Sequence, residues 1–238
     1  MGNDCKYRWA VTVLGGLACL AFSDVQAQQT IYNVPSADVT EKNQVFLEHE
    51  SQFRAWAPGR YWYGTHYFSY GAGHYTELDA SLYNLSSPAS GNLTLGAGFK
   101  TTLPLLPKKF PRREIKLTGG TQVLVSLQGK GVGNWSYGHL SVRVPRLNTR
   151  LTAGVSAGTS HLFGRSSVHF IGGLEQPVTK RITLLADWYS GKHSIGFLTS
   201  GFSVAMPRQT TLFVGYQVPN NRKVAGGQGF TIEVAKFF

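Results

Sequence analysis

Apolar and polar residues alternate along most of the chain from about residue 44 onwards. In Arg150–Ala157, one face carries Leu, Ala, Val and Ala, while the other carries Arg, Thr, Gly and Ser. The same period of two recurs in residues 181–188 and 211–216. Successive side chains of a β-strand point to opposite faces, so this pattern predicts strands with one apolar and one polar face. Helical periodicity is missing, and 28 glycines are spread too evenly for long helices.

The alternation predicts about twelve strands, with ten and fourteen as the alternative counts. The expected ranges are 44–54, 60–70, 74–83, 91–103, 113–127, 134–144, 148–158, 166–175, 179–189, 193–205, 209–217 and 227–238. The first could instead be a short helix or a plug, because residues 45–50 alternate poorly. Tight connections with proline and a basic residue alternate with longer connections rich in Gly, Ser and Asn, except that residues 104–112 form a long connection on the side of the tight ones. This arrangement is typical of an all-β, antiparallel up-and-down barrel.

The first 27 residues have the features of a secretory signal peptide. Lys6 and Arg8 precede an apolar run from Trp9 to Phe22, and Ala27 ends a small-residue cleavage pattern. A lipoprotein signal that uses Cys19 is the alternative reading. The expected organisation is therefore a signal peptide over 1–27, a periplasmic N-terminal lead over 28–43 and a transmembrane barrel over 44–238.

Removal of the signal peptide changes the chemistry that is available to the chain. Both cysteines, Cys5 and Cys19, are lost, which excludes disulfides, thiolate zinc sites and cysteine nucleophiles and favours a bacterial envelope protein. The net charge stays at +11, because two basic and two acidic residues leave together. A nucleic-acid partner is not expected, since no basic helix, zinc module or aromatic–basic platform occurs.

Alternation alone does not say which face lines the interior. A soluble barrel is apolar inside, whereas a membrane barrel is polar inside and apolar outside. Eight of the ten carboxylates after residue 27 fall on polar strand faces, together with basic residues, as the walls of a polar lumen would require. Aromatic residues near both ends of the apolar faces fit interfacial girdles. The expected lumen-lining residues are Glu77, Asp79, Lys100, Lys116, Arg143, Arg150, Glu175, Arg181, Asp187 and Glu233.

The C-terminal segment supports the membrane interpretation. Residues 230–238 end on Phe238, with apolar Val234, Ile232 and Phe230 at alternate positions upstream. This resembles the C-terminal signature of Gram-negative outer-membrane β-barrels, from which Lys236 departs at a position that is usually apolar. The resemblance implies location in the bacterial outer membrane and recognition of the last strand by the barrel assembly machinery. It identifies a general class and no specific family.

One pair of residues suggests catalysis. His139 and Ser141 are two positions apart and therefore share a strand face, as a Ser–His nucleophile and base would. The pair resembles the H-x-S element of outer-membrane phospholipase A, but only Asn148 is available as an orienting amide, across a turn. The alternation also places both residues on the lumen face, whereas that enzyme needs them to face lipid. We therefore interpret them as polar lumen residues and expect no enzyme activity.

Other ligands receive little support from the sequence. The seven histidines show no metal-binding spacing, so neither a metal nor a cofactor is expected. Basic residues gather in the predicted connections at both rims, where they either dock on outer-membrane lipid and lipopolysaccharide headgroups, which we favour, or attract anionic solutes to a pore mouth. The expected function is a channel for small polar or anionic solutes. The alternatives are a closed structural or adhesion barrel and a lipid-modifying barrel enzyme.

Overall fold

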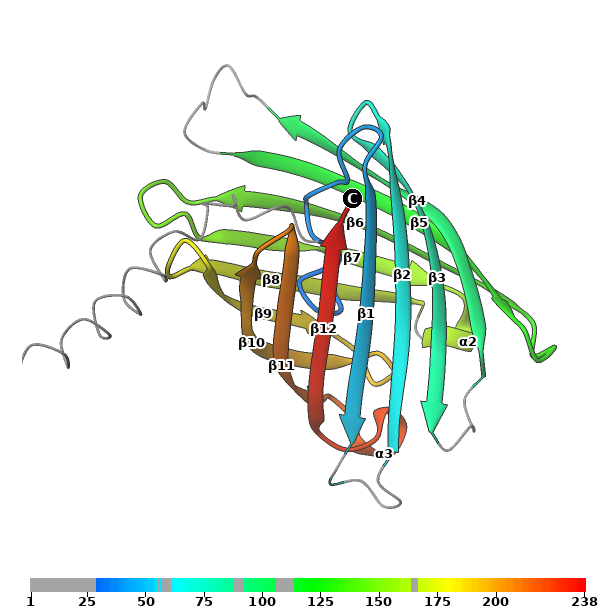
Figure 1. Cartoon of the computed structure of the whole chain (residues 1–238). Coiled ribbons are helices and arrows are strands. Elements are labelled where there is room, and N and C mark those ends of the chain that lie inside the picture. The colour runs from blue at the N-terminus through cyan, green and yellow to red at the C-terminus, as the bar shows by residue number, and fades with distance from the viewer. Residues whose placement is uncertain (1–28, 55, 57–60, 88–91, 106–113, 164–166) are drawn as a thin grey trace, which may run out of the picture.

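The computed structural model describes residues 29–54, 56, 61–87, 92–105, 114–163 and 167–238. The expected signal peptide, residues 1–27, lies outside the described residues. The rest forms a closed antiparallel β-barrel in which each strand pairs with its sequence neighbours and the first pairs with the twelfth (Figure 1). The predicted fold class and strand number are confirmed.

The strands follow the sequence alternation closely. They are β1 (Val45–Arg54), β2 (Tyr61–Gly73), β3 (Thr76–Ser87), β4 (Thr94–Leu105), β5 (Ile115–Ser126), β6 (Val132–Arg143), β7 (Arg150–Gly158), β8 (Val168–Pro177), β9 (Ile182–Tyr189), β10 (Phe197–Met206), β11 (Thr210–Pro219) and β12 (Gly229–Phe237). The short helices α2 (Ser160–Phe163) and α3 (Arg222–Ala225) lie in two of the connections. Among the described residues, no helix has the length and apolar character needed to cross a membrane. The first segment is a strand, which settles the choice between strand, helix and plug.

The two rims of the barrel differ. One, which we call the turn rim, carries the C-terminus and the tight connections, together with one long connection, residues 106–114 between β4 and β5. The other, the loop rim, carries longer connections, including those with α2 and α3. At the turn rim, His74 and Tyr75 both have positive φ, 50° and 61°, as a two-residue type I′ hairpin requires. Arg208 and Gln209 repeat this conformation between β10 and β11. The tight turns bring successive strands into direct register.

The outer surface of the barrel is apolar. In β7, Val155 has 54% of its surface exposed, whereas the adjacent Ser156 has 1% exposed. Each strand contributes at least one large exposed apolar side chain: Leu47, Phe68, Leu78, Phe99, Leu117, Leu140, Leu151, Phe170, Leu184, Phe202, Val218 and Ile232. A water-soluble barrel buries such residues.

The interior is correspondingly polar. Each strand buries at least one polar or charged side chain: Glu50, Thr65, Glu77, Lys100, Thr118, His139, Thr152, His169, Asp187, Thr199, Gln217 and Glu233. The small apolar core that does exist is built around Ile31, Tyr32 and Val34, which precede the first strand. The interior is therefore filled partly by the strands and partly by the segment before them.

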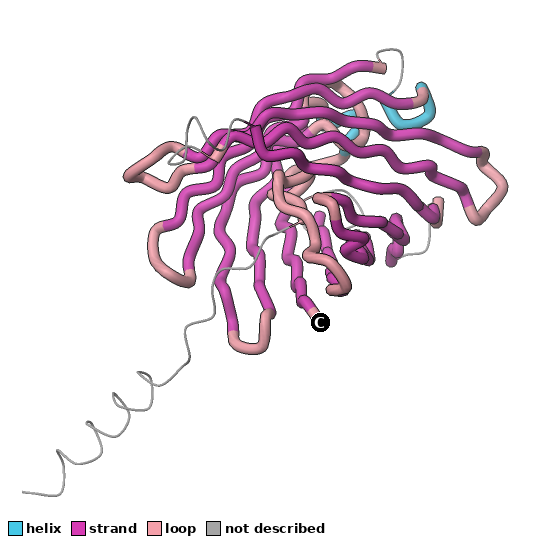
Figure 2. Tube along the Cα trace, turned by 90° about the horizontal axis from the view of Figure 1, so that it is seen from above, coloured by secondary structure: helices cyan, strands magenta, loops and turns pink. Residues whose placement is uncertain are grey.

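The position of the N-terminal lead corrects the sequence-based expectation. We expected residues 28–43 to lie outside the barrel, on its periplasmic side; instead, the described part folds into the lumen, and the view along the barrel shows a loop within the ring of strands (Figure 2). Ile31, Val34 and Ala37 have no exposed surface. The lead enters because its apolar side chains leave water there and its backbone donors meet charged groups of the wall.

Candidate functional site in the barrel lumen

Three anchors hold the lead in the lumen. The first is Asp187 on β9, whose Oδ2 accepts hydrogen bonds from the consecutive backbone N–H groups of Tyr32, Asn33 and Val34 at 3.0, 2.5 and 2.7 Å. The Asn33 side chain adds a hydrogen bond to Thr199 on β10 at 2.8 Å. Successive N–H groups that converge on one oxygen form an anion-binding concavity, so Asp187 fixes both the position and the backbone conformation of the lead.

The second anchor is Asp38. Both terminal nitrogens of Arg150 on β7 donate to its carboxylate, at 2.6 and 3.0 Å, and Lys116 on β5 lies 3.0 Å from it. Burial would by itself raise the pKa of Asp38, but Arg150 and Lys116 outweigh burial and hold this pKa well below its usual range. Asp38 is therefore a permanently charged latch at ordinary pH.

The third anchor is Glu77 on β3. Its carboxylate accepts hydrogen bonds from the Gln29 side chain at 2.8 Å and from the Thr40 backbone N–H at 2.6 Å. It also pairs with the Lys100 ammonium on β4 at 2.9 Å, and Lys100 donates in turn to the Gln29 backbone carbonyl at 3.2 Å. The two ends of the lead segment 29–40 thus converge on one wall ion pair.

Glycines on the lumen faces make room for the lead. A Cβ atom at Gly173 would lie 2.2 Å from Cδ1 of Ile31, and one at Gly215 would lie 2.8 Å from the Tyr32 ring. The Tyr32 hydroxyl donates to the Val214 carbonyl at 2.8 Å. Burial raises the pKa of Tyr32, and the carboxylates of Glu233 and Asp187 raise it further, so this hydroxyl stays a donor. The wall is shaped to receive these two side chains.

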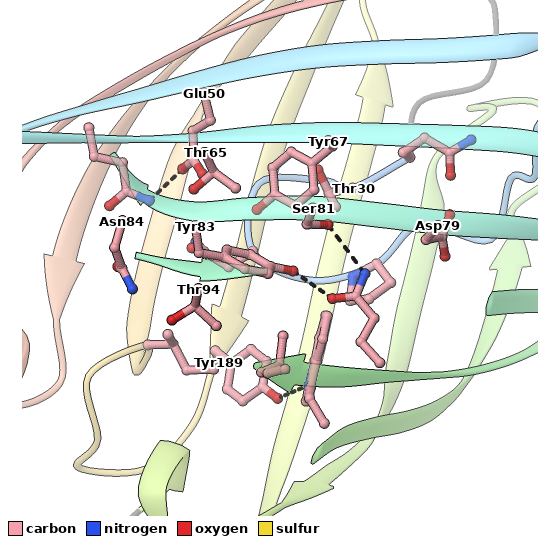
Figure 3. Close-up of a pocket in the computed structure, with 18 of the residues that line it drawn as sticks. Thr30, Glu50, Thr65, Tyr67, Asp79, Ser81, Tyr83, Asn84, Thr94 and Tyr189 are labelled. Carbon is pink, nitrogen blue, oxygen red and sulfur yellow. Dashed lines mark hydrogen bonds between the residues drawn. The ribbon is translucent and has the colours of Figure 1, made fainter. Parts of the chain in front are cut away.

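A cavity of about 480 Å³ occupies the lumen beside the lead (Figure 3). Lead residues, among them Gln29, Asn33 and Pro35, form part of its lining, and loop-rim residues such as Ser194 and Val224 form another. Its walls combine tyrosines with amides, hydroxyls and carboxylates; residues of this wall include Glu50, Tyr63, Thr65, Tyr67, Asp79, Tyr83, Gln122, Trp135, Tyr137 and Tyr189. Hydrogen bonds connect some of these side chains across the wall: the Tyr83 hydroxyl donates to Gln122 at 2.7 Å, and the Trp135 indole donates to Tyr189 at 2.9 Å. The lumen therefore contains a cavity with a partly aromatic and partly polar wall.

The ten expected lumen residues do not all occupy equivalent positions. Glu77, Lys100, Arg150, Asp187 and Glu233 are buried on the polar face, and Asp79, Lys116, Arg143 and Glu175 are half-buried there. Arg181 differs: it precedes β9 at the turn rim and is exposed. The pattern predicts a strand over 179–189, but β9 begins three residues later, at Ile182, so Arg181 falls outside it.

Lys100, Lys116, Arg143 and Arg150 do not form a row of unpaired positive charges along the lumen. Lys100 pairs with Glu77, and Arg150 pairs with Asp38 and with Glu175 at 3.4 Å. Arg143 binds Glu114 at 2.7 Å, and Glu114 also pairs with Lys116. These charges neutralise one another, so they do not provide an open track for anions.

His139 and Ser141 lie on the lumen face of β6 and are both buried. Ser141 Oγ lies 3.4 Å from His139 Nδ1 but only 2.7 Å from the Thr152 hydroxyl. The long contact to His139 is a poor one for proton transfer, and the shorter contact engages Ser141 with the neighbouring strand. Asn148, at positive φ in the turn before β7, is exposed and belongs to the turn rim.

Sequence reasoning missed the lead residues and the inward-facing aromatic residues. Two signals were present. Ile31, Tyr32 and Val34 are apolar residues crowded into a segment that was expected to lie in water, and Tyr67 and Tyr83 fall on the polar phase of their strands. Aromatic residues on a polar face indicate a lumen that is partly packed rather than filled with water.

Comparison with known proteins gives little further information. No family model and no curated protein matches the chain. Among solved structures, an outer-membrane channel from Pseudomonas putida F1 superposes with a TM-score of 0.46 at 11% sequence identity, covering 84% of this chain and 97% of that chain.

Proposed function

We propose that this protein is a β-barrel of the bacterial outer membrane that passes small polar solutes and that its N-terminal lead closes the passage in the conformation described. The observation that carries this proposal is the distribution of residues in the closed barrel: large apolar side chains outside, polar and charged ones inside. An apolar outer wall suits lipid, and barrel closure leaves no strand edge without hydrogen bonds in a hydrocarbon environment.

Features of the two rims support membrane insertion. At the loop rim, the rings of Tyr216 and Phe230 contact each other at 5.3 Å, and Trp56 packs on both. At the turn rim, Phe68, Tyr70 and Phe238 are exposed. Exposed basic residues lie beyond both aromatic bands, where anionic lipid and lipopolysaccharide headgroups would meet them: Lys130, Arg146, Lys180, Lys192, Arg208, Arg222 and Lys223. We assign these bases to headgroup docking.

The lumen supports passage of small polar solutes more than a preference for anions. Its wall holds a cavity of about 480 Å³ with hydroxyl, amide and carboxylate groups, and its main basic residues are engaged in ion pairs. The lead is held by its apolar residues and by polar contacts, and the polar contacts can exchange with water when the segment moves, which suits a removable plug. We therefore propose neutral or cationic solutes and a gate formed by residues 29–40.

A closed structural or adhesion barrel is the second candidate, and the three anchors of the lead favour it, because together they connect the lead to β3, β5, β7 and β9. For the enzyme alternative, the supporting contact is that of His139 with Ser141, and its lumen position places it away from lipid.

Reconstitution separates the two candidates. The mature protein is expected to fractionate with outer membranes and to fold in detergent as a heat-modifiable species. In planar bilayers we expect small or infrequent conductance steps for the native chain and larger, frequent steps for a variant that lacks residues 29–40. Absence of conductance and of solute uptake into liposomes for both proteins would exclude the channel and leave the closed barrel.

A further inference from the structure

Three carboxylates lie side by side in the lumen wall formed by β1 and β12. Glu48 and Glu50 are on the same face of β1, and Glu233 on β12 is the register partner of Glu50. Their exposed fractions are 5%, 4% and 1%. Like charges that face each other across two strands are destabilising, so this arrangement weakens the barrel unless something compensates it.

Hydrogen bonds and ion pairs compensate the repulsion between these three carboxylates only in part. Glu50 accepts hydrogen bonds from the Gln52 side chain and from the Thr231 hydroxyl, the latter at 3.2 Å. Glu233 Oε2 is buried and has no hydrogen-bond partner. Within the described part of the chain, none of the three carboxylates takes part in an ion pair.

In the residues that the structure describes, the nearest lumen cations make no ion pair with these carboxylates. One terminal nitrogen of Arg54, on the same face of β1, lies 2.7 Å from acceptors of Gln52, Tyr63 and Gln217, whereas its Nε and its other terminal nitrogen are buried without a hydrogen-bond partner. Lys100 is bound to Glu77 and Gln29. Other inward-facing acids have closer partners: Asp187 accepts from three backbone N–H groups, Asp79 accepts from the Ser69 hydroxyl at 2.7 Å, and Asp38, Glu114 and Glu175 pair with arginine or lysine. A cluster of three buried carboxylates that makes no ion pair departs from the pattern of most of this lumen, and such departures mark functional sites.

Aromatic rings flank the same carboxylates. Tyr67 on β2 is the register partner of Glu48, and its ring contacts that of Tyr83 edge-to-face at 5.8 Å. Glu50, Tyr67 and Tyr83 all line the cavity, and Figure 3 shows them on its β1–β3 side. Aromatic faces bind organic ammonium ions through cation–π attraction, and a carboxylate in the same cavity supplies the opposite charge.

We infer that the cavity binds a small organic ammonium ion, with Glu50 and its neighbours Glu48 and Glu233 as counter-charge and Tyr67 and Tyr83 as the aromatic wall. This inference rests on the proposed function and names the solute class of that lumen. A metal ion fits less well, because no three such ligand groups within the described residues are arranged to hold one. The volume, about 480 Å³, suits a ligand of modest size.

Choline and its uncharged isostere 3,3-dimethylbutan-1-ol provide the matched probes. Isothermal titration of the full mature barrel in detergent is expected to give binding of choline at least about tenfold tighter than binding of the alcohol, since desolvated cation–π contacts and the counter-charge act on the cation alone. Acetate is expected not to bind. Equal affinity for choline and the alcohol, or no binding of either, would overturn the inference.

Variants then locate the site. Glu50→Gln and Glu233→Gln are each expected to weaken choline binding about tenfold or more. Tyr67→Leu should weaken it, whereas Tyr67→Phe, which keeps the ring, should retain it. Glu114→Gln, in the turn-rim ion-pair network, is the control and should bind as the native chain does. Heat-modifiability of each variant checks folding, and unchanged choline affinity in both glutamate variants contradicts the proposed site.

Measuring ion conductance as well as choline binding separates a failure of the ammonium site from a failure of the proposed channel. If the barrel conducts ions but binds no choline, the ammonium site is wrong and the channel stands. If choline binds but neither the native chain nor the variant without residues 29–40 conducts, the site stands in a closed barrel.

Discussion

The backbone N–H of Val34 donates to Asp187 Oδ2 at 2.7 Å, across 153 positions of sequence. Together with the N–H groups of Tyr32 and Asn33, it ties the segment before the first strand to the lumen face of β9. A buried carboxylate that satisfies three backbone donors is difficult to replace, because its removal leaves those donors without partners. Asp187 is therefore the anchor whose loss leaves three backbone N–H groups of the lead without their partner.

Asp187→Ala is expected to release the lead. Loss of three charge-assisted hydrogen bonds, each worth about 1.5–3 kcal/mol, should raise the fraction of open barrels by at least about tenfold. Single-channel recording in planar bilayers measures this as longer or more frequent openings. Thr183→Ala, on the same face of β9, is the control and should leave gating unchanged. A closed record for Asp187→Ala would mean that the other two anchors suffice to hold the lead.

The Asp38 latch predicts how gating responds to pH. Arg150 and Lys116 hold the pKa of Asp38 below its usual range despite burial, so the folded state binds this proton less readily than the unfolded chain. The stabilisation is complete above the ordinary aspartate pKa of about 4 and is lost only as pH falls through the lower folded-state pKa. We expect Asp38 to keep the lead latched from pH 8 down to about 4. Asp38→Asn should open more often throughout this range, and bilayer recordings at several pH values compare the two proteins.

Gly215 offers a steric test of the plug. A Cβ atom there would lie 2.8 Å from the Tyr32 ring and 2.9 Å from Cγ2 of Thr231. Gly215→Ala should therefore displace Tyr32, weaken its hydrogen bond to Val214 and increase conductance while the barrel remains folded. The double variant Gly215→Ala with Tyr32→Gly removes the clash with the ring but keeps the contact with Thr231, so it separates the effect on Tyr32 from an effect on the wall. If conductance in the single variant equals that of the native chain, Tyr32 is not part of the closure.

The sequence predicted the barrel well and its contents poorly, for a physical reason. Alternation such as that in residues 150–157 is set by the two faces of each strand, so strand number, phase and approximate limits can be read locally. The positions of Val34 and Asp38 depend on partners more than 100 positions away, Asp187 and Arg150, which no local pattern encodes. The same limit explains why the basic lumen residues suggested an anion path: the sequence shows Arg150 but not the carboxylate that neutralises it.

The lumen position of His139 and Ser141 predicts that the protein is not a lipid hydrolase. Purified protein is expected to release no fatty acid from phospholipid vesicles, with or without calcium, because both side chains are buried and Ser141 is engaged with Thr152. Free fatty acid measured over time checks this. Turnover that both Ser141→Ala and His139→Ala abolish would establish the enzyme instead.

The membrane assignment makes a prediction about two neighbouring faces of the wall. Val155, near the middle of β7, has 54% of its surface exposed on the outer face, whereas Thr183 on β9 has 7% exposed and faces inward. If the outer face contacts hydrocarbon, Val155→Arg should destabilise the folded barrel by about 2–4 kcal/mol, as charged residues near the bilayer midplane do. Thr183→Arg should cost much less, because its guanidinium can reach the polar lumen and the turn rim. Unfolding by guanidinium in lipid vesicles, followed by tryptophan fluorescence, gives both values. The opposite order, with Val155→Arg tolerated and Thr183→Arg disruptive, is the behaviour of a barrel whose outer face is in water, and it would contradict membrane insertion.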